Sequence, residues 1–186
     1  MLLVRKVAAG QSAIAALQRV AKVKTRYGGR FVEAIDGVEG SLTHRRDWFY
    51  FVNGYEADVG AADYTLHPGD VEWWDYRSWT KAMHVPIVVG AFPEPFLHGY
   101  GGKRRPAVVV GGPGGAAVAR AIHGTVYRRG ALLARNVNVL YLSAALRPRF
   151  AARLESDTPG SPVRVTFAGN WRQLVAGRFR YRYAVP

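Results

Sequence analysis

The chain contains no cysteine among its 186 residues. This absence excludes disulfide bonds, thiolate ligands for metal ions and cysteine nucleophiles. It leaves the cellular compartment open, because a domain with an adequate core can be secreted without disulfide bonds. No run of about 18 apolar residues occurs either, so the sequence predicts no transmembrane segment.

Acidic residues are scarce in the second half of the chain. Residues 1–90 hold 11 Lys and Arg against 10 Asp and Glu, whereas residues 91–186 hold 15 against 3. The formal net charge of +13 therefore belongs almost wholly to the second half. This asymmetry predicts two domains of different character, of which the basic one could bind a polyanion such as nucleic acid or a wall polymer. A solvated basic surface is the simpler interpretation.

The common catalytic and metal-binding motifs are absent. The five histidines form no i, i+4 pair and no HExxH motif, and no G-x-S-x-G occurs. Asp58, Asp63, Asp70 and Asp75 lie close together in the sequence and could be acid/base pairs or a calcium site. Asp63 and Asp70 stand beside expected turns, however, where carboxylates commonly accept hydrogen bonds from backbone N–H groups. We therefore expect no enzyme, no catalytic residue and no metal site.

A glycine-rich segment in the second half resembles a phosphate-binding turn. Gly112, Gly114 and Ala117 match G-x-G-x-x-A between an expected strand and an expected helix. No Asp or Glu occurs between Glu94 and Glu155, so the acidic partner of a ribose is missing. The half-chain is also short for a dinucleotide fold. A structural strand-to-helix turn is thus the default interpretation, and nucleotide binding is the alternative.

The pattern over residues 1–85 predicts a strand, a helix and then three or four strands. Leu2–Ala8 is typical of a strand, and Gln11–Lys24 is typical of a helix with Ser12 as its N-cap. Three dipeptides favour tight turns between strands: Asp36-Gly37, Asn53-Gly54 and Pro68-Gly69. This order is close to a β-grasp domain, which normally has a complete hairpin before its helix. The sequence therefore leaves two alternatives: the chain is truncated or begins at an internal start, or Met1 is the true start. In the first case Leu2–Ala8 would be an unpaired sheet edge.

The rest of the chain predicts a linker and a second domain. Residues 86–106 are rich in proline and glycine and are typical of a linker that lies against a domain surface. Residues 107–186 follow a βαββαβ order, in which the first helix is expected over residues 116–127 and an Arg-rich connection follows the strand Val137–Leu142. This order predicts a basic, ferredoxin-like α+β domain. In its last expected strand, Phe179–Val185, apolar residues alternate with arginines. Arg178, Arg180 and Arg182 are accordingly the expected polyanion-binding residues.

Aromatic residues are concentrated between Asp47 and Arg77. In the expected strands, Trp48 and Tyr50 point to one face, and Phe49 and Phe51 point to the other. Trp73 likewise opposes Trp74 and Tyr76. Aromatic residues on both faces exceed what one covering helix requires. The surplus face either packs inside the protein or forms a platform for a ligand.

Four segments of this half resemble a known family: GGRFVEAIDGVEG, DWFYFVNG, ADVGAADYTL and PGDVEWWDYR. They are similar to the C-terminal β-domain of the transcobalamin and intrinsic factor family, in its bacterial branch of unknown function. The resemblance is good over residues 29–79, looser over residues 10–28, and does not extend to the basic half.

The resemblance implies a ligand-binding role. In the family's carriers this β-domain covers one side of cobalamin, while a helical domain that is missing here covers the other. By position, the resemblance places Trp48, Tyr50, Asn53, Gly60, Asp63 and Tyr64 on or near the ligand side, where Trp73, Trp74 and Tyr76 would add stacking area. It implies a secreted or cell-envelope module for ligand binding or adhesion, with no cofactor and with cobalamin or another flat molecule as a possible ligand. Polyanion binding by the basic half is the alternative.

Overall fold

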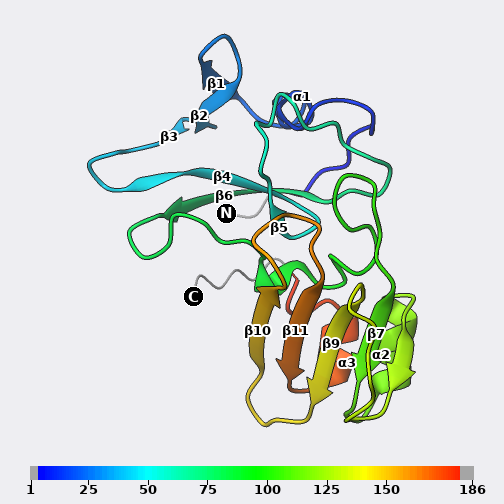
Figure 1. Ribbon diagram of the computed structural model, residues 1–186. Coiled ribbons are helices and arrows are strands. Elements are labelled where there is room, and N and C mark those ends of the chain that lie inside the picture. The colour runs from blue at the N-terminus through cyan, green and yellow to red at the C-terminus, as the bar shows by residue number, and fades with distance from the viewer. Residues whose placement is uncertain (1–3, 181–186) are drawn as a thin grey trace. The chain divides into compact units, whose positions relative to one another are not determined.

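The computed structural model describes residues 4–180 of the chain (Figure 1). It is a mixed α+β structure with short helices and several sheets, as the sequence predicted. Within the described residues the chain divides into two compact units. Unit 1 comprises residues 4–52 and 56–84, and unit 2 comprises residues 53–55 and 85–180. The proline-rich stretch of residues 86–106 falls within unit 2, where Phe92 and Phe96 belong to the core.

Unit 1 begins with a short helix, α1 (Ala13–Gln18). The predicted N-cap is confirmed, because Ser12 Oγ accepts a hydrogen bond from the Ala15 N–H at 3.3 Å. The helix buries Ala13, Ile14, Ala16 and Leu17. It ends earlier than predicted, since the residues from Val23 onward extend into a strand and pair with a neighbouring strand.

Unit 1 also contains two three-stranded sheets, except for Tyr55 of the second sheet, which belongs to unit 2. The first has the order β1 (Val23–Arg26), β2 (Phe31–Ile35), β3 (Val38–Glu39). The second has the order β5 (Tyr55–Glu56), β4 (Arg46–Val52), β6 (Glu72–Ser78). The predicted hairpin turns are confirmed, because Asp36, Gly37, Asn53 and Gly54 all have φ between 48° and 85°.

The predicted strand Leu2–Ala8 is wrong for the part that the structure describes. Residues 4–8 have no regular secondary structure and are exposed, and residues 1–3 lie outside the described residues. Backbone pairing begins at Gly10, whose N–H donates to the Leu66 carbonyl at 2.8 Å. Arg5 and Lys6 interrupt the apolar run, and Val4 and Val7 alone do not supply a face that a sheet could bury.

Unit 2 contains a five-stranded sheet with the order β10-β11-β9-β7-β8 (Figure 1). Four strands are parallel to one another: β7 (Ala107–Val110), β8 (Thr125–Tyr127), β9 (Asn138–Ser143) and β11 (Val163–Ala168). The edge strand β10 (Arg149–Leu154) runs antiparallel to β11. The helices α2 (Gly115–Ala121) and α3 (Trp171–Val175) pack on one face of this sheet, around a core that includes Val109, Leu140 and Phe167.

The ferredoxin-like arrangement is not confirmed for unit 2. The predicted helix over residues 116–127 ends at Ala121, and the chain returns beside β7 as the parallel strand β8. The Arg-rich connection contains β10, which the sequence analysis missed. The predicted strand Phe179–Val185 is wrong at its described residues, because Phe179 and Arg180 lie in a turn after α3.

Contacts with two other phenylalanines explain why Phe179 turns inward. Phe179 is buried, and its ring centroid lies 5.2 Å from that of Phe150 and 5.6 Å from that of Phe167. Arg178 and Arg180 therefore flank a core residue in a turn, and Arg182 lies outside the described residues. The expected row of guanidinium groups on one strand face is not formed by Arg178 and Arg180.

Asn53 supplies a first prediction for unit 2. Its side chain is fully buried, its φ is 51°, and its Nδ2 donates to the Gly99 carbonyl at 2.7 Å. Asn53→Ala removes the donor and places a residue that disfavours positive φ in the turn. We expect it to lower the free energy of unfolding by about 2–3 kcal/mol in urea titrations. Asn53→Gly keeps the turn conformation and should lose only about 1–2 kcal/mol. If the two variants lose the same free energy of unfolding, the positive φ of residue 53 makes no contribution.

Candidate ligand-binding site

Four aromatic residues form two cross-strand pairs on one face of β4 and β6. The register places Trp48 opposite Tyr76 and Tyr50 opposite Trp74. The ring centroids are 5.2 Å apart in both pairs, and the Tyr50 and Trp74 planes are inclined by only 24°. All four side chains are half-buried. We call this set the aromatic ladder; it confirms that the two strands alternate in the way predicted.

The polar atoms of the ladder are held by hydrogen bonds within unit 1. The Trp48 indole N–H donates to the Val38 carbonyl at 2.8 Å, and the Tyr76 hydroxyl donates to the Glu39 carbonyl at 2.9 Å. The Tyr50 hydroxyl donates to the Val59 carbonyl. These bonds fix the orientation of the rings, so their exposed parts form a preorganised apolar surface.

Glu72 adds a carboxyl group to the same face. It stands two residues before Trp74 on β6, and its Oε1 accepts a hydrogen bond from the Trp74 indole N–H at 2.5 Å. Burial raises the pKa of Glu72 from 4.5 to about 7, although the Trp74 hydrogen bond opposes the shift. Burial and the nearby Glu72 also raise the pKa of Tyr50. The ladder thus ends beside a carboxyl group that changes its charge near neutral pH.

The raised pKa of Glu72 makes unit 1 less stable at higher pH. The folded state holds the proton more tightly than the unfolded state, so the free energy of unfolding falls as pH rises from about 4.5 through about 7. The loss should be about 2 kcal/mol, allowing for partial solvent screening. Glu72→Gln keeps an acceptor for Trp74 without the charge. We expect the difference in stability between variant and wild type to grow over this pH window, and a constant difference would contradict it.

The loop before β6 contains three more of the predicted ligand-side residues. Asp63 Oδ1 and Oδ2 accept hydrogen bonds from Arg30 at 2.7 and 2.6 Å. The Gly60 carbonyl accepts hydrogen bonds from the N–H groups of Asp63 and Tyr64. Tyr64 is buried, and its hydroxyl donates to Asp70 Oδ2 at 3.4 Å. This loop is tied to the ladder through Val59, which bonds Tyr50.

Trp73 and Asn53 lie apart from the ladder. Trp73 is on the opposite face of β6, across from Phe51 of β4. Asn53 is buried and belongs to unit 2. Of the nine predicted ligand-side residues, the structure therefore places Trp48, Tyr50, Trp74 and Tyr76 together, with Gly60, Asp63 and Tyr64 in the adjoining loop.

Arg77 is the main feature of this region that sequence reasoning missed. It is only 5% exposed, and its guanidinium carbon lies 3.7 Å from the centroid of the Phe49 ring, on the face opposite the ladder. Its terminal nitrogens donate to the carbonyls of Ala82 at 2.6 Å and Met83 at 2.9 Å, and lie 3.6 Å from Glu56 Oε1. Alternation along β6 predicts that Arg77 points to the face away from Trp74 and Tyr76. It does not predict the burial of Arg77, which depends on the later loop that contains Ala82 and Met83.

The glycine-rich turn of unit 2 is filled by protein atoms. A Cβ added to Gly112 would lie 2.5 Å from the Leu142 carbonyl oxygen, and one added to Gly114 would lie 2.2 Å from the Trp171 ring. These glycines therefore allow close packing of a strand and a helix, which favours the structural interpretation over a phosphate cradle.

Within residues 4–180, no group of three or more His, Asp or Glu side chains is arranged to hold a metal ion. No helix in this part of the chain is long and apolar enough to cross a membrane.

Comparison with known proteins gives one match. Residues 10–78 match a family described as a domain of unknown function, DUF4430. The match covers most of unit 1, including every residue of the aromatic ladder. No curated protein and no solved structure matches the chain.

Proposed function

We propose that unit 1 is a non-enzymatic module that binds a flat, largely apolar small molecule on the aromatic ladder. The observation that carries the proposal is the set of four half-buried rings, fixed in orientation by hydrogen bonds at their edges. Stacking on rings that are already oriented avoids much of the entropy cost of binding. The proposal also assigns unit 1 a transcobalamin-like, β-grasp-like fold. This assignment is more specific than the match to a domain of unknown function.

A corrinoid is the first ligand to test. The segments that carry the ladder resemble the side of the carriers' β-domain that faces cobalamin, and the family match covers the same residues. All four rings lie on one face of β4 and β6, so the ladder contacts only one side of a flat ligand. We expect micromolar affinity, about −8 kcal/mol. The same resemblance supports a role in the cell envelope or outside the cell.

The test compares two neighbouring tryptophans on opposite faces of β6. Equilibrium dialysis of a corrinoid against wild type should give saturable binding. Trp74→Ala should weaken it by about 1–3 kcal/mol, because the variant loses a ladder ring. Trp73→Ala removes an equal area from the other face and should leave the affinity within about twofold. Circular dichroism identifies a variant that fails to fold.

Two results would overturn the proposal. One is an absence of saturable corrinoid binding by the folded wild type, together with an absence of binding to smaller flat aromatic probes. The other is an equal loss of affinity in the folded Trp73 and Trp74 variants, which would show that the ladder does not contact the ligand.

A further inference from the structure

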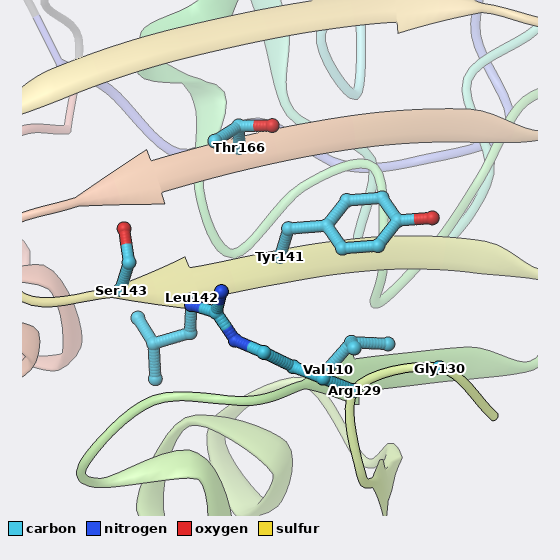
Figure 2. Close-up of a pocket in the computed structure, with 7 residues that line it drawn as sticks. All are labelled: Val110, Arg129, Gly130, Tyr141, Leu142, Ser143 and Thr166. Atoms are coloured by element: carbon cyan, nitrogen blue, oxygen red, sulfur yellow. The ribbon is translucent and has the colours of Figure 1, made fainter.

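The strand order of unit 2 reverses between β7 and β9. From β7 the chain passes through α2 to β8 on one side, and from β8 it crosses to β9 on the other side. In open parallel sheets, ligands bind beyond the carboxyl ends of the strands at such a reversal, because the loops diverge there. A cavity of about 290 Å³ lies at this point (Figure 2). Its lining residues are Val110, Arg129, Gly130, Tyr141, Leu142, Ser143 and Thr166.

The cavity presents a cation and hydroxyl groups. Arg129 follows β8 and extends toward Leu142 of β9, and Ser143 and Thr166 each contribute a hydroxyl group, while the Tyr141 ring extends away from Ser143 (Figure 2). The Arg129 side chain lies against Gly111, since a Cβ there would be 2.8 Å from Arg129 Nε. None of the seven lining residues is Asp or Glu. Guanidinium and hydroxyl donors without a carboxylate suit an oxyanion, above all a phosphate.

An exposed aromatic ring lies beside this anion site. Tyr141 is 39% exposed although it stands on an interior strand of the sheet. Tyr127 of β8 is 38% exposed and lies in the same cross-strand row, because Val110 pairs with both tyrosines. The two tyrosines are thus two strands, or roughly 10 Å, apart. Exposed rings on a sheet next to cationic groups are suited to stack nucleobases.

The basic surface extends beyond the cavity onto β10. Ala151 pairs with Thr166, so Arg149 and Arg153, two residues to either side, share the face of Thr166. Both arginines are exposed. Arg164, by contrast, is engaged by Glu155, with 2.8 Å between Nε and Oε1. The cationic groups therefore span the sheet from Arg129 to Arg153, a longer stretch than one phosphate occupies.

We propose that this face of the unit 2 sheet binds single-stranded nucleic acid, with a backbone phosphate in the Arg129 cavity and a base stacked on Tyr141. Arg149 and Arg153 bind neighbouring phosphates. The rings read no particular sequence, since every base has a face that can stack. The site uses neither Arg178 nor Arg180, and it uses no residue of the aromatic ladder.

The test measures fluorescence anisotropy of labelled oligo-dT and oligo-U of about 12 nucleotides with the whole protein. Binding should weaken with salt, with a slope near −0.7 in log K against log salt for each phosphate bound. Tyr141→Ala should weaken binding at least fivefold through loss of stacking. Arg129→Gln should weaken it about tenfold and reduce the salt slope by about one phosphate. Both residues are exposed, so the variants should fold.

Arg178→Gln is the matched control. It makes the same charge change at an exposed position in the turn after α3, next to Phe179, which packs on the helix-covered face of the sheet, and it should change affinity less than twofold. Equal losses of affinity in the Arg129 and Arg178 variants would show that only the net charge matters, and would contradict a phosphate site at Arg129. Oligonucleotide binding that is unchanged in the folded Tyr141→Ala variant would contradict base stacking and leave only a general polyanion surface. If a free mononucleotide binds more tightly than the oligonucleotide, the ligand is a small nucleotide and the proposal of single-stranded nucleic acid is wrong.

Discussion

Replacing Gly112 by alanine should cost unit 2 about 3–4 kcal/mol of its free energy of unfolding. Two effects add. Gly112 has φ of 71°, a conformation that L-residues adopt at a cost. An added Cβ would also lie 2.5 Å from the Leu142 carbonyl oxygen and 2.8 Å from its carbon. Both are backbone atoms of an interior strand, so they cannot move aside as a flexible side chain could.

The control is Gly130→Ala in the same unit. Gly130 has φ of 79°, but an added Cβ meets no atom within 4 Å. It should therefore lose only the backbone contribution, about 1–2 kcal/mol. Urea unfolding followed by circular dichroism measures both variants. If Gly112→Ala is as stable as Gly130→Ala, the close packing of the turn against β9 is not a source of stability.

Replacing Arg77 by methionine should destabilise unit 1 by about 3–4 kcal/mol. The change removes the charge that faces the buried Glu56 and the donors to the Ala82 and Met83 carbonyls. It also removes the guanidinium group over the Phe49 ring. Glu56 would keep its contact with His84, whose Nδ1 lies 3.0 Å from Glu56 Oε2, and this contact should moderate the loss.

Arg46→Met is the matched control for Arg77. Arg46 is exposed, and its guanidinium carbon lies 5.5 Å from the centroid of the Tyr76 ring. We expect it to lose less than about 1 kcal/mol in thermal or urea unfolding. A similar loss in both variants would mean that burial of Arg77 adds nothing beyond an exposed cation–ring contact.

Features set by neighbouring residues could be predicted from the sequence. The Asp36-Gly37 and Asn53-Gly54 turns were predictable, because they depend on two residues that tolerate positive φ. The alternation of faces within β4 and within β6 was also predictable, since alternation along a strand is a local property. The register that brings the four rings of the ladder together was not predicted, because it depends on how the two strands pair.

Features set by distant residues could not be predicted. The helix α2 ends at Ala121 because His123 takes φ of 48° and Gly124 packs against the Ala107 carbonyl, where a Cβ would be 2.8 Å away. The apolar spacing of residues 116–127 contains neither fact. Parallel pairing of β8 with β7 likewise depends on the tertiary fold, and so does the cavity at Arg129. The candidate site on unit 2 was missed for this reason.

The three residues 53–55 have a consequence for how this protein could have been assembled in evolution. They lie inside the DUF4430 match yet belong to unit 2, where Tyr55 is buried with Ile87 and Phe92. Neither unit is therefore a continuous stretch of the gene. A recombination that joined residues 1–84 to a different second half would leave Tyr55 without its core. A new partner of this module would therefore have to bury the side chain at residue 55 again, or the residue would have to change to a small polar one.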